Sequence, residues 1–526
     1  MSWNYHNIGL IIAYHYYYVD NCFLFRIIIV SLKTKPDTIQ KNRKLDINST
    51  QNGILGEIMA QESQKNLKRY GFENQEEVLD TVHDSSSKIE FVQIMFSDIL
   101  GRPMDFSIPS SKLLEAFRNG KGFDGSSVEG FVRTEESDLV IKPDAKTFRV
   151  LPWDYTGFDK NNTWREGVIF GDIYTPEGKP YEGDSRYVLK NVLKKGKDDF
   201  GIDEIKVGPE LEFFLFPNNH EARPLDEGGY FFSGRHGEIR KEIQLLLKRI
   251  GIESEYDHHE VAHGQHEIDL HYLSAVEMAD TCMLFRHMVK KVARMHNLYA
   301  TFMPKPLNGQ NGSGMHVHQS LWNRELNLFF EKNHTYHLSK MARHYIAGIM
   351  THSREISAVL CQWTNSYKRL IERYEAPVYV AWGQRNRSAY IRVPECQPGK
   401  EQASRIELRS PDPACNLYLA FACMFMTGFT GIQQEYELPA PVEENIYIMS
   451  NAKQKSLNIK TLPRSLEEAV KIMSQSELAK QILGEHIFST FLANKQREID
   501  EYRSNVSKEY DKQVSEFEVK KYLPFL

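Results

Sequence analysis

Apolar and polar residues follow two different periods along this chain, and each period predicts a different element. Strict alternation places successive side chains on opposite faces of a strand. It predicts strands over 88–96, 104–108, 204–216, 266–272, 316–322, 390–393 and 406–410. Apolar residues at helical spacing predict helices over 75–82, 111–119, 185–199, 237–250, 275–296, 339–362 and 416–434, and a charged helical region over 465–520. Because strands and helices are interspersed without a regular βαβ repeat, we predict an α+β fold with a mostly antiparallel sheet.

The order of these elements divides the chain into parts. We expect a small α+β domain over residues 61–160, a larger domain over 161–507 and a C-terminal tail over 508–526. Residues 8–32 are apolar and aromatic, but His15, Asp20 and Arg26 interrupt them, and they lack the features of a signal peptide. We therefore expect residues 1–60 to be a peripheral extension or to precede a true start downstream, with Met59 as the candidate. We favour the second interpretation.

The composition excludes several classes of partner. The chain has 526 residues, 41% hydrophobic and 26% charged, with a formal charge of −5, which is typical of a globular protein. We expect neither nucleic acid nor a membrane as a partner, because no basic face and no long apolar span is implied. The six cysteines are scattered without a CxxC pair, which favours a reducing cytoplasm over a disulfide framework or a zinc site.

A glycine-containing loop over 305–314 leads into a strand with polar residues on one face. Glycine lets backbone approach a ligand closely, and on a strand His316, His318 and Ser320 point the same way. Two imidazoles and a hydroxyl beside such a loop are typical of a polar pocket wall. A surface hairpin with incidental histidines is the alternative, and this stretch by itself does not decide between them.

Carboxylates occur on other strands of mainly apolar character. The set with its imidazole partner is Glu210, Glu212, Glu260, Glu267, Glu407 and His316. Carboxylates facing a core are costly unless a positive charge compensates them. Mg²⁺ and Mn²⁺ prefer oxygen ligands with an occasional imidazole, so the set predicts a divalent-metal site. Pairing of each acid with a surface lysine is the less favoured alternative.

Arginines are dense further along, at Arg369, Arg385, Arg387, Arg392 and Arg409. Arginine binds carboxylate and phosphate bidentately, so a cationic region opposite an acidic, metal-binding one suits phosphoryl transfer to a carboxylate. No Walker A motif is present, so we expect ATP to be bound through metals and arginines.

Several separated motifs resemble class I glutamine synthetase in this order, over roughly residues 91–495. They are Asp124-Gly-Ser-Ser, Gly208-Pro-Glu-Leu-Glu, Glu260-Val-Ala-His-Gly-Gln-His-Glu267, Asn311-Gly-Ser-Gly-Met-His316, Asn365-Ser-Tyr-Lys-Arg369, Tyr374-Glu-Ala-Pro377, Arg385-Asn-Arg-Ser388 and Glu407-Leu-Arg-Ser-Pro-Asp-Pro413. The resemblance implies an N-terminal β-grasp domain and a catalytic domain whose mostly antiparallel strands form an open, funnel-shaped barrel flanked by helices.

The resemblance also implies residue roles. One metal ion would be held by Glu212, Glu260 and Glu267, and a second by Glu210, His316 and Glu407. The glutamate-binding residues would be Asn311, Gly312, Arg369, Glu375 and Arg409, and the ATP-binding residues Glu255, Tyr272, His318, Ser320, Arg387 and Arg392. Asp124 and Ser127 would bind ammonium, the catalytic residues would be Asp124, Glu375 and Arg392, and Arg133 would be regulatory.

The implied reaction is the ATP-dependent ligation of ammonia to the γ-carboxylate of L-glutamate through γ-glutamyl phosphate. Two or more Mg²⁺ or Mn²⁺ ions per subunit would serve as cofactors. The resemblance implies two stacked hexameric rings, in which Asp124 reaches the active site of a neighbouring subunit. It favours the branch in which Arg133 is linked to feedback inhibition by glutamine. We do not expect adenylylation at Tyr447, which lacks the usual motif around the modified tyrosine.

The chain departs from the family pattern at three places: residues 371–373 before Glu375, Asn308 where phenylalanine is usual, and residues 362–364. Because of the first departure, a second function is an alternative: a γ-glutamyl-amine ligase that uses a larger amine in place of ammonia. The intact Asp124 and Glu375 favour ammonia. A catalytically inactive regulatory homologue is the second alternative, which loss of a metal ligand would support; none is lost.

Overall fold

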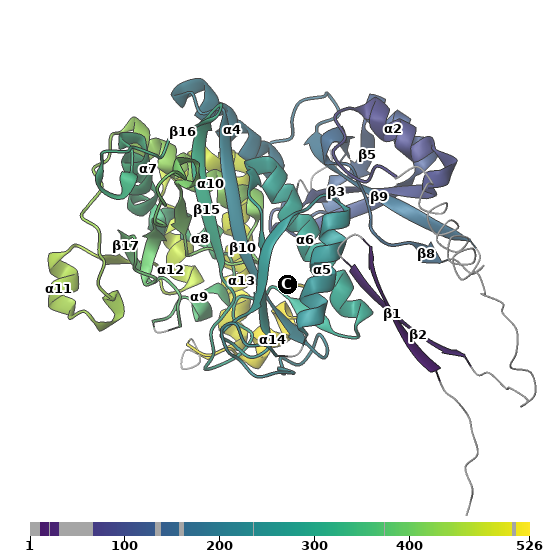
Figure 1. The fold of residues 1–526 in the computed structure, drawn as a ribbon. Helices are drawn as coiled ribbons and strands as arrows, with labels where there is room; N and C mark the ends of the chain where they lie inside the picture. Colours follow the sequence, from purple (N-terminus) through teal and green to yellow (C-terminus); the bar gives the residue numbers. More distant parts are fainter. Residues whose placement is uncertain are drawn as a thin grey trace, which may run out of the picture. The chain divides into compact units, whose positions relative to one another are not determined.

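The computed structural model of the chain describes residues 11–19, 22–30, 67–131, 138–156, 162–234, 236–372, 374–507 and 512–526. Strands β1 (Ile11–Val19) and β2 (Cys22–Val30) pair antiparallel and belong to a unit of their own, Met1–Asn66. Leu67–Leu526 form one compact unit (Figure 1). Apart from β1 and β2, the residues of the expected N-terminal extension lie outside the described ranges.

The N-terminal part of the compact unit is built on a twisted sheet. Its order is β4 (Pro103–Pro109), β3 (Ile89–Ser97), β9 (Thr163–Tyr174), β6 (Asp138–Pro143) and β5 (Lys121–Asp124), and β7 (Arg149–Val150) and β8 (Tyr155–Thr156) also pair with β9. Helices α2 (Gln75–His83) and α3 (Leu113–Asn119) contribute apolar residues to the core of this sheet. The boundary expected at residue 160 falls before β9, although β9 pairs with β3 and β6, so this sheet extends to Tyr174.

The larger sheet has eleven strands. Its main path is β11 (Ser254–His259), β12 (Gln265–Leu270), β10 (Glu204–Phe216), β15 (Met315–Asn323), β19 (Ile406–Leu408), β18 (Ala389–Arg392), β17 (Tyr379–Gly383) and β20 (Lys460–Thr461). β13 (Leu273–Ser274), β14 (Tyr299–Thr301) and β16 (Leu326–Asn327) pair beside it. Among the described strand pairs of this sheet, only β17–β18 is parallel, so the expected mostly antiparallel α+β fold is confirmed.

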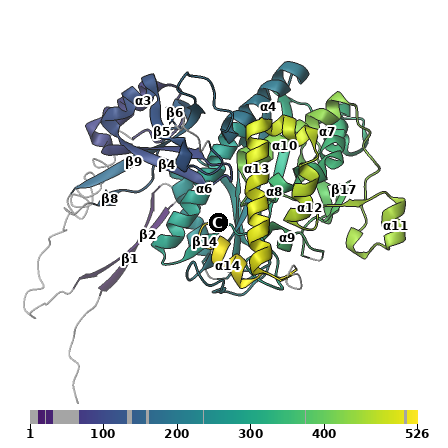
Figure 2. The ribbon, with the colours of Figure 1, turned by 180° about the vertical axis from the view of Figure 1, so that it is seen from behind.

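Helices cover the sheet, with α10 (Leu417–Gln433) at the centre (Figure 2). The other helices of this part are α4 (Ser185–Phe200), α5 (Gly237–Arg249), α6 (Ala275–Met295), α7 (Lys340–Thr351), α8 (Ser353–Leu360), α9 (Ser366–Arg369), α12 (Leu466–Met473), α13 (Glu477–Asn505) and α14 (Glu516–Tyr522). Helix α11 (Asn451–Ser456) projects to one side, away from the sheet (Figure 1). A Cβ on Gly348 of α7 would lie 2.2 Å from the Thr427 carbonyl oxygen of α10. Glycine at 348 therefore permits backbone contact between the two helices.

The single helix predicted over 339–362 is wrong, because the chain turns at His352. This residue has φ −95° and ψ 7°, outside the helical range, and it separates α7 from α8. The His352 Nδ1 lies 2.9 Å from Glu355 Oε1, and the Ser353 hydroxyl donates to the Met350 carbonyl at 2.8 Å. These local hydrogen bonds stabilise the turn in place of a continuous helix.

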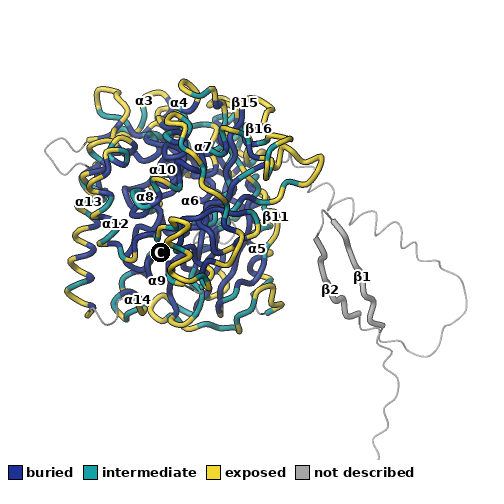
Figure 3. Tube along the Cα trace, turned by 90° about the vertical axis from the view of Figure 1, so that its left-hand side faces the viewer, coloured by how far each residue is buried: buried dark blue, intermediate teal, exposed yellow. Residues whose placement is uncertain are grey.

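The end of the chain is part of the core and not a separate tail. Tyr522, Leu523 and Leu526 are buried in the same apolar core as α10. Figure 3 colours the chain by burial and labels α14 and the C-terminus. The Phe302 N–H donates to the Leu526 carbonyl at 2.9 Å. The tail predicted after residue 507 is corrected accordingly for residues 512–526. Among the described residues, no helix is both long and apolar enough to span a bilayer.

Candidate active site

The register of five neighbouring strands places the predicted metal-binding residues side by side. Glu212 on β10 is opposite Glu267 on β12, and Glu210 is opposite His316 on β15. Glu407 on β19 is opposite both His318 on β15 and Arg392 on β18. Residues distant in sequence thus meet on one face of the sheet because strand pairing and the two-residue period bring them there.

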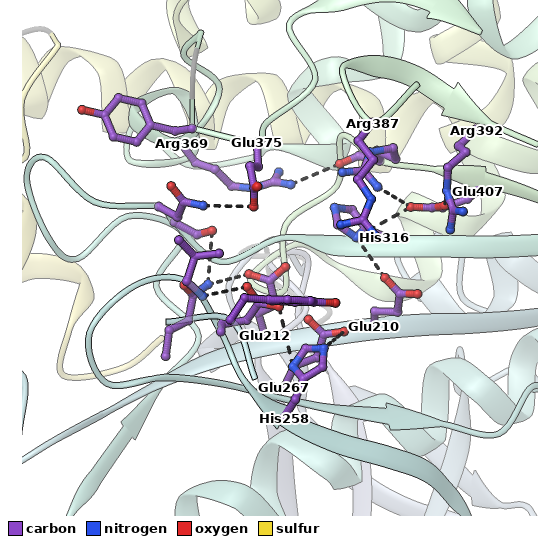
Figure 4. A pocket seen from close by; sticks show the side chains of 18 of the residues that line it. Glu210, Glu212, His258, Glu267, His316, Arg369, Glu375, Arg387, Arg392 and Glu407 are labelled. Carbon is purple, nitrogen blue, oxygen red and sulfur yellow. Dashed lines mark hydrogen bonds and ion pairs between the residues drawn. The ribbon is translucent and has the colours of Figure 1, made fainter. Parts of the chain in front are cut away.

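All of these residues except His318 line a cavity of about 240 Å³ (Figure 4). Every predicted metal-binding residue lines it: Glu210, Glu212, Glu260, Glu267, His316 and Glu407. Every predicted glutamate-binding residue also lines it: Asn311, Gly312, Arg369, Glu375 and Arg409. The structure therefore brings together two groups that the sequence places on separate motifs.

One side of the cavity concentrates negative charge. Ligand atoms of His258, Glu260 and Glu267 lie within 4.8 Å of one another, and Glu212 accepts hydrogen bonds from Gln265 Nε2 at 2.5 Å and Gly314 N at 3.0 Å. Burial raises the pKa of Glu260 to about 7. Burial and the charge of Glu212 raise the pKa of Glu267 well above its ordinary value. The protein itself leaves these carboxylates without enough positive charge.

On the other side of the cavity, positively charged side chains compensate the negative charge of the carboxylates. His316 Nδ1 lies 2.9 Å from Glu210 Oε2 and 3.8 Å from Glu407 Oε1. Burial opposes ionisation of Glu407, yet the guanidinium of Arg409, whose Nη1 donates to Glu407 Oε1 at 2.6 Å, lowers the pKa of Glu407 to about 2. Arg392 donates a second hydrogen bond to the same carboxylate. This side holds charged acids at any physiological pH.

Both sides fit a divalent cation by their donor chemistry. Each offers carboxylate oxygens and one imidazole, the donor set that Mg²⁺ or Mn²⁺ accepts. The buried His258 Nδ1 has no hydrogen-bond partner and lies 3.7 Å from Glu260 Oε1. A cation between the carboxylates would also offset the cost of burying their charges and their mutual repulsion, which together raise their pKa values.

The residues expected around glutamate border the acidic side. Asn311 Nδ2 donates to Glu375 Oε2 at 3.2 Å, which links the 305–314 loop to the segment carrying Glu375. Glu375 has φ 56°, a left-handed conformation that is uncommon for a non-glycine residue. Arg369 is buried, and its guanidinium donates to the carbonyls of Ser410 at 2.7 Å and Arg409 at 3.1 Å. These bonds fix one guanidinium in the cavity wall.

A second cavity of about 530 Å³ adjoins the first, and the two share Glu210, Tyr256 and Arg392. Five of the six predicted ATP-binding residues line it: Glu255, Tyr272, His318, Ser320 and Arg392. Arg387, the sixth, lines the first cavity instead. His318 Nε2 lies 2.8 Å from Glu210 Oε1, so one side chain connects the two cavities.

The predicted ammonium residues lie elsewhere on this chain. Asp124 ends β5 and accepts a hydrogen bond from Ser126 N at 2.8 Å, and both Asp124 and Ser127 are exposed. Of the two cavities just described, neither is lined by Asp124 or Ser127. Arg133, the predicted regulatory residue, lies outside the described ranges.

Sequence reasoning missed several side chains around these cavities, among them the following four. His258, Tyr230 and Tyr256 line the first cavity, and Arg405 lines the second, where its Nε donates to His318 Nδ1 at 3.2 Å. His258 could have been found, because strand alternation places it on the same face as Glu260. The others carry no comparable local signal.

Comparisons with known proteins agree with this geometry. The family model described as glutamine synthetase, catalytic domain, matches residues 182–514, and the one described as glutamine synthetase, beta-Grasp domain, matches 88–176. The chain is 42% identical to the glutamine synthetase of Thermotoga maritima over 442 residues (83% of this chain, 96% of that one) and 43% identical to that of Methanosarcina mazei over 438 residues (82% and 95%).

Solved structures show the same fold. The chain superposes on a GmaS/ADP complex with a TM-score of 0.72 and 29% identity, covering 81% of this chain and 96% of that one. A Plasmodium falciparum glutamine synthetase superposes with a TM-score of 0.75 and 25% identity, covering 85% and 100%.

Proposed function

The chain belongs to the glutamine synthetase family, and from that premise we propose that its two adjoining cavities join ammonia to the γ-carboxylate of L-glutamate at the expense of ATP. The activity is that of a glutamate–ammonia ligase. One observation carries the proposal. The first cavity has one side with excess negative charge and another side rich in arginine, and it adjoins a second cavity.

Two groups of residues would hold the divalent ions. Glu212, Glu260 and Glu267 would bind one ion, with His258 as an additional candidate, and Glu210, His316 and Glu407 would bind the other. Bound Mg²⁺ or Mn²⁺ supplies charge neutralisation for phosphoryl transfer. Both ions accept this donor set.

The arginines orient and stabilise the substrates. Arg369 and Arg409 would bind the carboxylates of glutamate, and Arg387 and Arg392 would bind the ATP phosphates, since a guanidinium matches both groups bidentately. The γ-carboxylate then attacks the γ-phosphorus and ADP leaves, giving γ-glutamyl phosphate. Ammonia attacks the acyl carbon and phosphate departs. One structural relative, GmaS, is a complex with ADP, which supports a nucleotide in the second cavity.

Ammonia requires a residue to take the proton of ammonium. Asp124 and Ser127 remain the proposed ammonium-binding pair, and their position outside both cavities supports an arrangement in which a second copy contributes them. A homo-oligomer of two stacked hexameric rings with active sites between subunits would provide that contact. Glu375 would close the cavity against water after γ-glutamyl phosphate forms. Feedback inhibition through Arg133 stays a prediction.

The location proposed is the cytoplasm. Among the described residues the cysteines Cys282, Cys361, Cys396, Cys415 and Cys423 are all free. Free thiols are typical of a reducing compartment.

The test is phosphate release from ATP in the presence of Mg²⁺ and glutamate, with ammonium compared against a panel of primary amines. Ammonium-dependent release with glutamine as the product supports the proposal. Release only with a larger amine would transfer the activity to a γ-glutamyl-amine ligase. No release from a folded oligomer under any condition would favour an inactive homologue.

A further inference from the structure

The loop over residues 305–314, here named the substrate loop, carries Asn311 and Gly312 into the first cavity. Its position must be fixed for those two residues to meet glutamate. Part of its support is local: Ser313 N donates to the Pro304 carbonyl at 2.8 Å, and Gln265 Nε2 donates to the Gly312 carbonyl at 3.3 Å. Further support comes from residues near the C-terminus.

Residues 514–526, here named the C-terminal segment, are firmly attached to the catalytic core. The Tyr522 hydroxyl donates to Glu498 Oε1 at 2.7 Å, and the Tyr299 hydroxyl donates to the Pro524 carbonyl at 2.5 Å. Lys290 Nζ donates to the Phe525 carbonyl at 2.8 Å. Because Tyr522 is fully buried, this segment is a rigid support.

The C-terminal segment contacts the substrate loop through Asn308. Asn308 Nδ2 donates to the Val514 carbonyl at 3.0 Å, and the Val514 N–H donates to Asn308 Oδ1 at 2.7 Å. The side-chain amide thus pairs with both backbone groups of one residue, as a second strand would. Phenylalanine, the residue usual at position 308 in the resemblance described above, could make neither hydrogen bond.

A second connection holds the start of the loop. Asn365 is buried; its Oδ1 accepts from Lys305 N at 2.7 Å, and its Nδ2 donates to the Lys305 carbonyl at 3.0 Å and to Glu518 Oε1 at 3.2 Å. Glu518 in turn caps α14 by accepting from Ser515 N at 2.9 Å. The C-terminal segment therefore supports the substrate loop at its start and at its middle.

We propose that Asn308 is a positioning residue for glutamate, because it ties the substrate loop to the C-terminal segment and so orders Asn311 and Gly312. This inference rests on the proposed function. Asn308 is exposed, and both of its side-chain hydrogen bonds described above join it to Val514, so it acts through the loop it holds. Loss of its two hydrogen bonds leaves the loop in a broader ensemble, from which glutamate must select the ordered state.

The experiment compares Asn308→Ala and Asn308→Asp with Asn323→Ala. Asn323 is a matched control, since it is also exposed and its Nδ2 donates to the Gly201 carbonyl at 2.7 Å, in a hairpin outside both cavities. We expect both Asn308 variants to raise KM for glutamate by about three- to tenfold, with KM for ATP and kcat within about twofold of wild type. The Asp variant keeps the acceptor but repels the Val514 carbonyl. Asn323→Ala should change none of these constants.

Hydrogen exchange of the 305–314 peptide, followed by mass spectrometry, provides a readout independent of turnover. We expect faster exchange in Asn308→Ala and no change in Asn323→Ala. An unchanged KM for glutamate overturns the positioning role, whether or not exchange becomes faster. A wild-type protein that forms no glutamine would refute the proposed function instead, and loop exchange would still decide whether Asn308 orders the loop.

Discussion

Replacing Glu260 by glutamine should stabilise the metal-free protein at neutral pH while it weakens metal binding. Glu260 is buried beside Glu267 and His258, and its pKa rises from an ordinary 4.5 to about 7. In the unfolded chain the carboxyl ionises near its ordinary value. The folded protein therefore binds more protons between these two pH values, so its stability falls as pH rises through that interval.

The size of the effect follows from the same two values. A rise from 4.5 to about 7 corresponds to about 3 kcal/mol of lost folding free energy once the pH exceeds 7. Glutamine carries no charge and can still accept the hydrogen bond that Glu260 Oε2 receives from Val261 N at 3.0 Å. The variant should thus match wild type near pH 4.5 and exceed it by up to about 3 kcal/mol at pH 7.5.

The assay is urea denaturation in EDTA at pH 5 and pH 7.5, at equal protomer concentration because assembly also affects stability. Glu253→Gln is the control, since Glu253 is exposed and directly precedes β11, the strand that ends just before Glu260. Adding Mg²⁺ or Mn²⁺ should stabilise wild type more than Glu260→Gln. A variant that is equal to or less stable than wild type in EDTA at pH 7.5 would refute the claim that this side of the cavity is undercompensated.

Three further substitutions test other parts of the structure. Arg409→Lys weakens the hydrogen-bonded compensation of Glu407, and phosphate release should fall by about 100-fold with unchanged circular dichroism; a loss under threefold would contradict the role of Arg409. Lys495→Met leaves the buried Glu498, 2.8 Å from Lys495 Nζ, without its cation and should cost about 3–5 kcal/mol in urea denaturation. Tyr522→Phe removes the hydroxyl that donates to Glu498 and should cost about 1–3 kcal/mol, so an unchanged denaturation midpoint would exclude a structural role for the C-terminal segment.

The sequence alone determined which side chains share a face of a strand. Alternation is a property of the extended backbone, so Glu210 and Glu212 on one side, and His316 and His318 on another, could be predicted without tertiary information. The same rule would have included His258 with Glu260. The family resemblance rested on motifs that are local in the same sense, and the comparisons confirmed it.

Strand order and register could not be read from those local patterns. Glu212 meets Glu267 only because β10 pairs with β12, and Glu407 meets Arg392 only because β18 pairs with β19. Pairing is decided by packing across the whole sheet, including helices distant in sequence. For the same reason the helix break at His352 was missed, since helical periodicity continues through a turn.

The charge balance of the site and the role of the chain end were decided by tertiary structure. The sequence predicted one group of acids with a common role. In the structure, burial raises the pKa of Glu260, whereas neighbouring arginines lower the pKa of Glu407. Residues 512–526 looked like a tail because their partners, such as Asn308, lie some 200 positions away. Composition and periodicity describe neighbours along the chain, whereas pKa values and supporting contacts depend on neighbours in space.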